Sequence, residues 1–439
     1  MAASPARAVA FKVLMRVQEQ DAFAAELLHS DLPRSLSDTD RGLCTEIVMG
    51  VLRWQSALDI AISNVSGKQT KSLDPEVLIA LRIGAYQIRF LDRIPARAAV
   101  NESVELVKAA RKKSATGFAN AVLRKLISGA PDFPPAATPA QDLSQRLAHP
   151  QWLVSRWMEA FGAAAVQRVC EYDQVPPVTT VRLHGASAED LRSEGLETEP
   201  GAIVGGALRV RAGDVTKTRA FAEGRVFIQD EASQLVALLV GKGIRILDCC
   251  AAPGSKTAAL AFRNPEAKIV AAEIHPHRAR LLKDRVRSPN LEVLTADATA
   301  LNLGPVFDRV LADVPCSGTG TLARNPEIKW KLRKDDLADL HRRQVRILAA
   351  ALRHVAPGGR AVYSTCSLET EENSAVVQEV LGSHPEFRFV SCRDELIRLR
   401  ESGDFVWSDL DSMIRGAFLR TLPGVHPCEG FFAAIFQRD

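Results

Sequence analysis

Two cysteines stand in contexts where a thiol could do chemistry. Cys316 lies in the run 313–320, which reads DVPCSGTG, and Cys366 lies in 363–367, which reads YSTCS. Each run follows an apolar segment that is typical of a buried strand. A single cysteine is most often a small buried hydrophobe, but two at neighbouring strand ends could bring their thiols together. The pair therefore favours covalent chemistry, in which a thiolate attacks an electron-poor atom.

A loop of small residues precedes these cysteines and could receive a cofactor. Segment 248–257 reads DCCAAPGSKT and lacks the three glycines that cradle a pyrophosphate, so a nucleoside without phosphates fits better. Glu273 comes 19 residues after Gly254, near the spacing of about 20 expected for an acid that binds a ribose diol. Asp297 follows a third strand, where it could accept from an adenine amino group. S-adenosylmethionine is the commonest such cofactor on this architecture.

Alternating strands and helices from about residue 243 place these residues at one edge of a sheet. Strands are predicted at 245–250, 268–273, 291–294, 307–313 and 359–365, and helices from about 256, at 277–286 and at 335–355. Continuous apolar strands between amphipathic helices indicate a doubly wound, Rossmann-like α/β domain with a parallel sheet covered on both faces. Ligands of such sheets bind beyond the carboxyl ends of the strands.

The rest of the chain divides by composition. Its 439 residues suggest about three domains of roughly 150 residues each. Residues 1–130 show helical periodicity throughout and are predicted to form an all-helical domain. A Pro/Ala-rich linker is predicted at 131–144, because proline cannot continue a helix, and a small α+β connector at 145–238. Residues 239–439 are predicted to be the α/β domain.

The formal net charge of +4 points to no particular partner, but its distribution is uneven. Between Arg89 and Lys125, nine lysines and arginines stand against three acids. This excess could form a phosphate-binding face. It could equally be the solvated surface of a helix, and charge alone does not decide between the two interpretations.

Composition excludes several classes of protein. Hydrophobic residues make up 46% and charged residues 25%, which is ordinary globular usage. No apolar run approaches the ~20 residues that span a bilayer, and Arg7, Lys12 and Arg16 interrupt the segment where a signal peptide would lie. The eight cysteines show no C-x-x-C spacing, so a metal site is not expected. Without an export signal, a disulfide framework is not expected either. We therefore predict a soluble cytoplasmic protein without a membrane segment or a metal.

Three motifs together resemble the RNA cytosine-carbon-5 methyltransferases known as the Sun family: DCCAAPGSKT, ADVPCSGTGTLARNPEIKWK and YSTCSLETEEN. The helical first 130 residues resemble the NusB-like RNA-binding module of one branch, the RsmB proteins, which methylate small-subunit ribosomal RNA. HPQWLVSRW, VFIQDEASQLVA and the closing EGFFAAIFQR are similar to that branch as well. The resemblance covers essentially the whole chain.

The resemblance implies transfer of a methyl group from S-adenosylmethionine to carbon 5 of a cytosine in 16S rRNA, cytosine 967, through a covalent cysteine–cytosine intermediate. It implies that Cys366 is the nucleophile and that Cys316 is needed for product release. It assigns ten residues to the cofactor pocket: Cys250, Ala251, Ala252, Pro253, Gly254, Ser255, Lys256, Glu273, Asp297 and Asp313. Ser255 stands where the family usually has a glycine, and Glu273 where aspartate is commoner. Neither change removes the loop or the diol acceptor.

Alternatives to this interpretation differ in role, substrate or class. The two cysteines could exchange roles, because Pro315-Cys316 resembles the attacking motif of many DNA cytosine methyltransferases. The same reaction on transfer RNA is the nearest alternative, and the helical N-terminal domain argues against it. An RNA-binding assembly factor without catalysis is disfavoured by the intact cysteine pair. A small-molecule methyltransferase would leave the first 130 residues unexplained.

Overall fold

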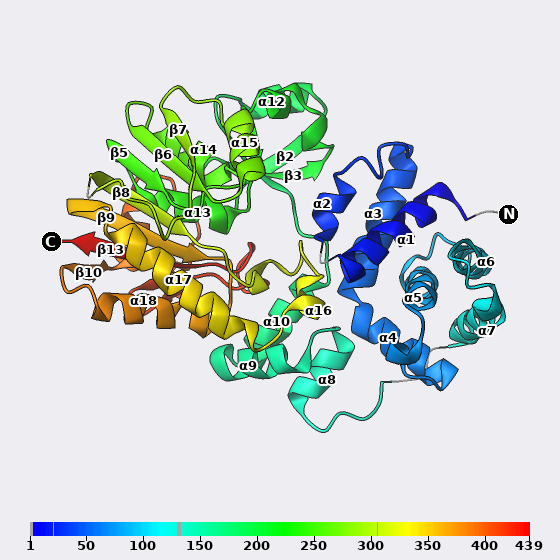
Figure 1. The fold of residues 1–439 in the computed structure, drawn as a ribbon. Helices are drawn as coiled ribbons and strands as arrows, with labels where there is room; N and C mark the ends of the chain where they lie inside the picture. The colour runs from blue at the N-terminus through cyan, green and yellow to red at the C-terminus, as the bar shows by residue number, and fades with distance from the viewer. Residues whose placement is uncertain (1–2, 21, 130–132, 305) are drawn as a thin grey trace. The chain divides into compact units, whose positions relative to one another are not determined.

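The computed structural model describes residues 3–20, 22–129, 133–304 and 306–439. The chain forms two compact units (Figure 1). The first comprises Met1–Pro176 and Leu322–Leu332, and the second comprises Pro177–Thr321 and Arg333–Asp439. The domain limits predicted at residues 130, 144 and 238 remain a proposal about which parts of the chain fold independently.

The described part of the first unit is helical, as was predicted for residues 1–130. Its α-helices are α1 (Pro5–Glu19), α2 (Ala24–Leu28), α3 (Asp38–Arg53), α4 (Gln55–Ser66), α5 (Pro75–Phe90), α6 (Ala96–Ala109), α7 (Thr116–Ile127), α8 (Pro139–Arg146), α9 (Gln151–Phe161), α10 (Ala163–Asp173) and α16 (Ile328–Lys331), with 3₁₀ turns η1 (Thr70–Ser72) and η2 (Lys113–Ala115). Every residue of α5 from Val77 to Gln87 is buried. Because α5 contacts α1, α3, α4, α6 and α7, it is the central helix of this bundle and needs apolar surface all round.

Helix α8 begins at Pro139, inside the segment 131–144 that was predicted to be a linker. Of the predicted linker at 131–144, residues 131 and 132 lie outside the described residues. Thr138 caps α8 by accepting from the Gln141 N–H, and Pro139 takes the first helical position, where its missing N–H costs nothing. The next helix, α9, ends at Gly162, whose φ is 80°.

The connector forms a small antiparallel sheet in the order β2-β3-β1-β4. Its elements are β1 (Thr180–Leu183), α11 (Ala188–Ser193), β2 (Glu197–Pro200), β3 (Ala207–Ala212), η3 (Val215–Lys217), α12 (Arg219–Ala222) and β4 (Val226–Ile228). Val181, Leu191 and Val226 belong to its own small core. The helices and strands of this region give it the α+β character that was predicted.

The main sheet has the order β11-β12-β13-β9-β8-β5-β6-β7, with β10 pairing to β13. Its strands are β5 (Arg245–Asp248), β6 (Lys268–Glu273), β7 (Leu291–Thr295), β8 (Phe307–Asp313), β9 (Val355–Thr365), β10 (Phe387–Val390), β11 (Ile414–Arg415), β12 (Phe418–Arg420) and β13 (Phe432–Arg438). The five predicted strands, β5 to β9, run parallel. The C-terminal strands add antiparallel pairs beyond β9, so the sheet is mixed rather than wholly parallel.

Helices cover both faces of this sheet (Figure 1). They are α13 (Glu231–Val240), α14 (Ser255–Arg263), α15 (Pro276–Arg285), α17 (Asp336–Leu352), α18 (Ser374–Gly382) and α19 (Cys392–Glu401), with 3₁₀ turns η4 (Thr319–Thr321), η5 (Thr370–Glu372) and η6 (Leu410–Met413). Successive strand residues alternate between two cores: Ile246 packs with α13 and α14, whereas Leu247 packs with α17 and α18. This period of two is why the strands are apolar throughout. The doubly wound fold is confirmed.

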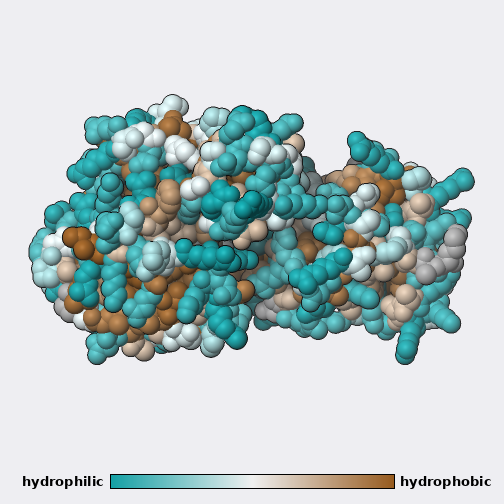
Figure 2. All heavy atoms as spheres, turned by 90° about the horizontal axis from the view of Figure 1, so that it is seen from above, coloured by the Kyte–Doolittle hydropathy of each residue, from teal (hydrophilic) through white to brown (hydrophobic). Residues whose placement is uncertain are grey.

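No helix of the described residues combines the length and the apolar character that crossing a membrane requires. The face drawn in Figure 2 is mostly hydrophilic, with apolar side chains in separate patches.

Candidate active site

The two predicted reactive cysteines lie side by side at the carboxyl edge of the main sheet. Neighbouring strands β8 and β9 are parallel, and Asp313 at the end of β8 pairs with Ser364 on β9. Residues just past both strands therefore meet at one edge. The Sγ atoms of Cys316 and Cys366 are 3.3 Å apart. Both side chains are half-buried, so the thiols are partly shielded from solvent but remain accessible.

The surroundings of Cys316 favour its protonated form. Its contact with the Cys366 sulfur and its burial raise the pKa of Cys316 well above the ordinary value, and the Glu372 carboxylate adds to this effect. A thiol that keeps its proton can donate a hydrogen bond to a neighbouring sulfur. The arrangement is therefore suited to a Cys316 that keeps its proton.

Lys256 brings a buried positive charge to this pair. Its Nζ lies 2.7 Å from Oδ2 of Asp313 and 5.1 Å from the centre of the Phe431 ring. Burial by itself would lower the pKa of Lys256, but the Asp313 carboxylate outweighs it and, with a smaller effect of Cys366, raises that pKa. Ser364 Oγ donates to the other Asp313 oxygen at 2.6 Å. Lys256 therefore stays an ammonium within electrostatic reach of Cys366.

The loop Cys250–Lys256 leads from β5 into α14 and turns at Gly254. The φ of Gly254 is +110°, in the region that only glycine adopts without strain. A Cβ atom at this position would lie 2.5 Å from Cδ1 of Leu282 on α15. Glycine is thus required both by the turn and by the packing of α15 against it.

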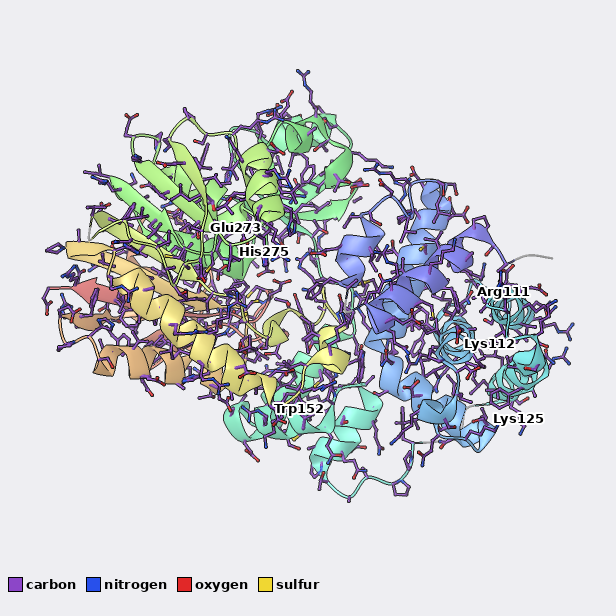
Figure 3. All side chains as sticks on the ribbon, viewed as in Figure 1. Arg111, Lys112, Lys125, Trp152, Glu273 and His275 are labelled. Carbon is purple, nitrogen blue, oxygen red and sulfur yellow. The ribbon has the colours of Figure 1, made fainter. Side chains whose placement is uncertain are left out.

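Acidic side chains stand at the same edge on β6 and β7 (Figure 3 labels Glu273 and His275). Glu273 ends β6, and its Oε1 accepts from the His275 N–H at 2.9 Å. Its Oε2 makes no hydrogen bond to any described residue and is open to a diol. Asp297 lies two residues beyond β7, where its Oδ1 accepts from the N–H and the hydroxyl of Thr299, both at 2.8 Å. These bonds lower the pKa of Asp297.

Asp248 at the end of β5 was not singled out from the sequence. It is 1% exposed, and Thr257 Oγ1 donates to its Oδ2 at 2.7 Å. Its buried Oδ1 has no partner among the described residues, and such an acceptor calls for a donor. S-adenosylmethionine carries ammonium and hydroxyl donors. The orphaned oxygen of Asp248 and the carboxylate of Glu273, which lie at the ends of neighbouring strands, fit the donors of this cofactor.

We expect Asp248→Asn to remove a pH dependence of stability. Burial raises the pKa of Asp248 from 3.8 to about 7. Between these values the folded protein keeps a proton that the unfolded chain has lost, so stability falls as the pH rises from about 4 to about 7. At ~1.4 kcal/mol per unit, this residue accounts for up to about 4 kcal/mol. Urea unfolding of both proteins at pH 5 and pH 8, without cofactor, measures the difference; equal pH dependence would contradict a neutral Asp248.

The other cysteines have a structural character. Cys44, Cys170, Cys249, Cys392 and Cys428 are buried free thiols, and Cys250 is half-buried. Burial raises the pKa of each of the five buried thiols, which makes them unreactive. Within the described ranges, no group of three or more metal-ligating side chains could hold an ion.

Sequence reasoning also missed a buried polar cluster beneath the two thiols. Its centre is Glu372, which is fully buried in η5 and accepts from Ser317, Ser367 and Gln344. The only signal was the run ETEEN at 369–373, directly after the Cys366 strand. Such a run of acidic residues is typical of a solvent-exposed turn. The hydrogen-bond donors that allow Glu372 to be buried come from distant parts of the chain, so the local sequence does not predict its burial.

The basic stretch between Arg89 and Lys125 lies in the first unit, on the end of α5, on α6, on α7 and in the connections between these helices. Eight of its nine cations are exposed, and Lys112 is half-buried. Lys112 Nζ lies 2.9 Å from Oδ2 of Asp74. Seven of the nine form no ion pair with any described residue (Figure 3 labels Arg111, Lys112 and Lys125).

Segment Leu322–Leu332 follows the Cys316 loop in sequence but packs inside the first unit. Glu327 Oε1 accepts from the Ala24 N–H, at the start of α2, at 2.8 Å. Lys329 Nζ donates to the Arg53 carbonyl, at the end of α3, at 2.8 Å. An anion at a helix start and a cation at a helix end both complement the helix dipole.

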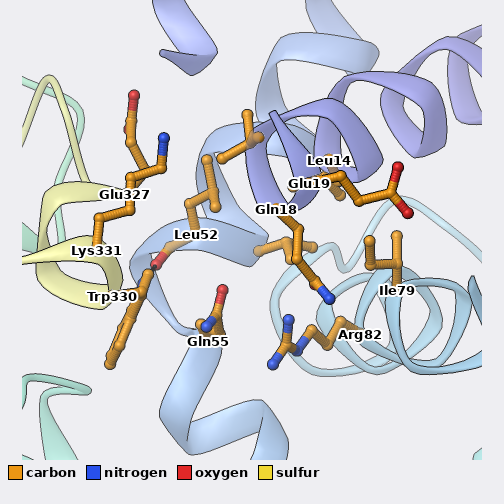
Figure 4. A pocket seen from close by; sticks show the side chains of 12 residues that line it. Leu14, Gln18, Glu19, Leu52, Gln55, Ile79, Arg82, Glu327, Trp330 and Lys331 are labelled. Atoms are coloured by element: carbon orange, nitrogen blue, oxygen red, sulfur yellow. Dashed lines mark hydrogen bonds between the residues drawn. The ribbon is translucent and has the colours of Figure 1, made fainter. Parts of the chain in front are cut away.

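A pocket of about 400 Å³ lies beside this segment (Figure 4). It is bounded by α1, α3, α5 and the segment. Trp330 stands on one side with its Nε1 donating to the Leu52 carbonyl at 2.6 Å, and Gln18 and Arg82 stand on the other. None of the predicted catalytic or cofactor residues lines this pocket, so it is not part of the candidate active site.

Comparisons with known proteins match the chain along its length. Residues 236–437 match the model of the 16S rRNA methyltransferase RsmB/F family, and residues 4–128 match the NusB family. The chain is 33% identical over 449 residues to the probable ribosomal RNA small subunit methyltransferase B of Bacillus subtilis (strain 168), covering 98% of both chains. It is 35% identical over 414 residues to the ribosomal RNA small subunit methyltransferase B of Vibrio cholerae, covering 91% of this chain and 90% of that one.

A solved structure has the same fold. The crystal structure of PH0851 superposes with a TM-score of 0.81 at 24% identity and covers 100% of both chains. The family resemblance carried by the three motifs and by the helical N-terminal region is confirmed by these matches.

Proposed function

Because the chain belongs to the RsmB/Sun family of S-adenosylmethionine-dependent rRNA cytosine-C5 methyltransferases, we propose that it methylates carbon 5 of one cytosine in 16S rRNA, cytosine 967 by the family resemblance. The observation that carries this proposal is the pair of sulfur atoms 3.3 Å apart at the carboxyl edge of the sheet. The exposed cations of the NusB-like region would bind RNA phosphates. The reaction would take place in the cytoplasm.

Carbon 5 of cytosine is a poor nucleophile, and covalent catalysis removes this obstacle. The Cys366 thiolate adds to carbon 6, so a carbon–sulfur bond forms and the ring becomes an enamine. Carbon 5 then takes the methyl group; the bound cofactor supplies that group in activated form, on a sulfonium. One difficult step is thereby divided into easier ones.

Product release reverses the addition. The proton on carbon 5 must leave, the ring electrons reform the double bond, and the bond from carbon 6 to Cys366 breaks, which returns the thiolate. Cys316 is the group we assign to this stage, because its sulfur lies 3.3 Å from that of Cys366. Because a thiol that keeps its proton cannot take another, Cys316 would position the base that removes the carbon 5 proton.

The charges around the pair support this division of roles. Lys256 remains positive beside Asp313 and would stabilise the Cys366 thiolate. Asp313 would accept hydrogen bonds from the cytosine amino group and ring nitrogen, which steadies the ring during addition. The cofactor would be held by Glu273 through its ribose and by the loop around Gly254.

The target base must leave its stack to reach half-buried thiols. This is least costly in a loop or single strand, where bases are already unpaired. An RNA-binding region in the same chain fits such a substrate, because phosphate contacts fix the register of the RNA without reading its sequence.

Mapping 5-methylcytosine tests the substrate. We expect the purified protein to methylate one cytosine of 16S rRNA, and we expect that mark to be absent from 16S rRNA of cells that lack the protein and restored by its expression. Transfer RNA, assayed in parallel, should remain unmodified. Methylation of transfer RNA alone would replace the proposed substrate, and no methylation of either RNA would favour the non-catalytic assembly factor.

A further inference from the structure

One buried carboxylate ties together the two loops that carry the thiols. Glu372 is 0% exposed. Its Oε1 accepts from the Ser317 backbone N–H at 2.8 Å and from Gln344 Nε2 at 2.8 Å. Its Oε2 accepts from the hydroxyls of Ser317 and Ser367. Ser317 directly follows Cys316 and Ser367 directly follows Cys366, so both loops end on the same side chain.

Burying a carboxylate without a cation is costly unless hydrogen bonds replace its hydration. Glu372 receives four such bonds, which is close to the capacity of a carboxylate. Oε2 draws the two serine hydroxyls to within 3.0 Å of each other. Glu372 would be costly to bury without these hydrogen bonds. Because both loops must supply them, Glu372 fixes the distance between the two loops.

The elements around Glu372 hold it rigidly. The Tyr363 hydroxyl donates to the Glu372 carbonyl at 2.6 Å. Gln344, on α17, also donates to the Pro315 carbonyl at 3.0 Å, just before Cys316. Asn373 Nδ2 donates to the Ser367 carbonyl at 2.8 Å. Each loop is therefore held at more than one point, and Glu372 is the point that they share.

We propose that Glu372 is a positioning residue for the reaction: through Ser317 and Ser367 it sets the separation and direction of the Cys316 and Cys366 thiols. This inference rests on the proposed function, since it assigns an attacking and a releasing thiol. Reactive groups displaced by about 1 Å can lose on the order of 100-fold in rate. Glu372 touches neither sulfur, so it acts through the loops.

A second effect points the same way. The negative charge of Glu372 helps to raise the pKa of Cys316, after the larger effects of the Cys366 contact and of burial. Cys316 thus keeps its proton while Cys366 attacks. Both thiols depend on the same carboxylate, one through position alone and the other through position and charge.

The test separates adduct formation from adduct release. Adduct formation is followed in the Cys316→Ser background as the appearance of a protein–RNA band on denaturing gels. Release is followed with Cys316 present, as the rate of multiple-turnover methylation relative to that of single-turnover methylation. Glu372→Gln should lower both rates, each by about 100-fold. Ser367→Ala should slow chiefly adduct formation, and Ser317→Ala chiefly release. Cofactor affinity should stay within about twofold in all three variants, which loss of the fold would not allow.

Glu371→Gln is the matched control, because it changes the same residue type one position earlier in the same turn. It should keep both rates near those of the unaltered protein. If Glu372→Gln left both rates within about threefold, Glu372 would not position the thiols. If Glu372→Gln did not fold, equal effects of Ser317→Ala and Ser367→Ala on both rates would overturn the inference. Absence of any adduct or methylation in the unaltered protein would instead contradict the proposed function.

Discussion

Replacing Cys366 with alanine should lower methyl transfer to less than about 1% while cofactor binding survives. The expected loss is large because the Cys366 thiolate makes a covalent bond that no neighbour can make in its place. At ~1.4 kcal/mol per factor of ten, losing a covalent nucleophile removes several kcal/mol of barrier reduction. Cofactor affinity should hold, because Cys366 is not among the residues proposed to hold the cofactor, which lie at or just beyond the ends of β5, β6, β7 and β8 and around the start of α14.

Single-turnover methylation of a 16S rRNA fragment and calorimetric titration with S-adenosylmethionine measure the two effects separately. Cys44→Ala provides the control, because Cys44 is a buried thiol in the core of the helical unit and should be dispensable for activity. Residual turnover of Cys366→Ala above about one percent would contradict its assignment as nucleophile. Parallel loss of cofactor binding would mean that Cys366 belongs to the cofactor pocket.

The parts of the fold that could be predicted are those encoded locally. The strand at 268–273 reads KIVAAE and is buried from Ile269 to Glu273. Its six residues alone therefore predict its apolar character, its length and its acidic end. Glu273 and Cys366 were found for the same reason, since each stands just where an apolar strand stops. A parallel sheet gathers such ends at one edge. Position along a strand was therefore enough to place a residue at the site.

The parts that could not be predicted depend on contacts between distant segments. Lys329 lies in the motif NPEIKWK, where a lysine among polar residues reads as exposed, yet it is 1% exposed. Its Nζ is satisfied by the carbonyls of Arg53 and Ala148, and burial lowers the pKa of Lys329 to about 7. Glu372 is also buried through a distant partner. Ser317, which donates hydrogen bonds to its carboxylate, lies 55 residues away in the sequence. No periodicity or spacing encodes such pairs.

The antiparallel strands at the C-terminus were missed for a different reason. β11 and β12 have two and three residues, too short to show an alternation. β13 is apolar over its first five residues, like a parallel strand, because it is buried between β9 and the strands beyond it. The hydrophobicity of a strand indicates whether it is buried, but it does not indicate whether the strand runs parallel or antiparallel to its neighbours.

Cys316→Ser should separate the two thiols by trapping the RNA. If Cys366 attacks and Cys316 assists release, the variant should form the adduct and transfer the methyl group, then stall with RNA bound to Cys366. Denaturing gels should show a slowly migrating protein–RNA band that is absent from the unaltered protein, with turnover lowered by about 100-fold or more. The sulfur separation of 3.3 Å makes this a demanding test, because either thiol is close enough to do either task.

The double variant Cys316→Ser with Cys366→Ser identifies the attacking sulfur. The band should vanish in it, since the trapped bond is the one from Cys366 to carbon 6. A band formed by Cys366→Ser alone would exchange the two roles, as the Pro315-Cys316 motif of the DNA enzymes suggests. The structure favours the first outcome: burial, the Cys366 contact and Glu372 all raise the pKa of Cys316, whereas the charge of Lys256 lies within reach of Cys366. A thiol held in its protonated form is a poor nucleophile and a suitable partner for the one that attacks.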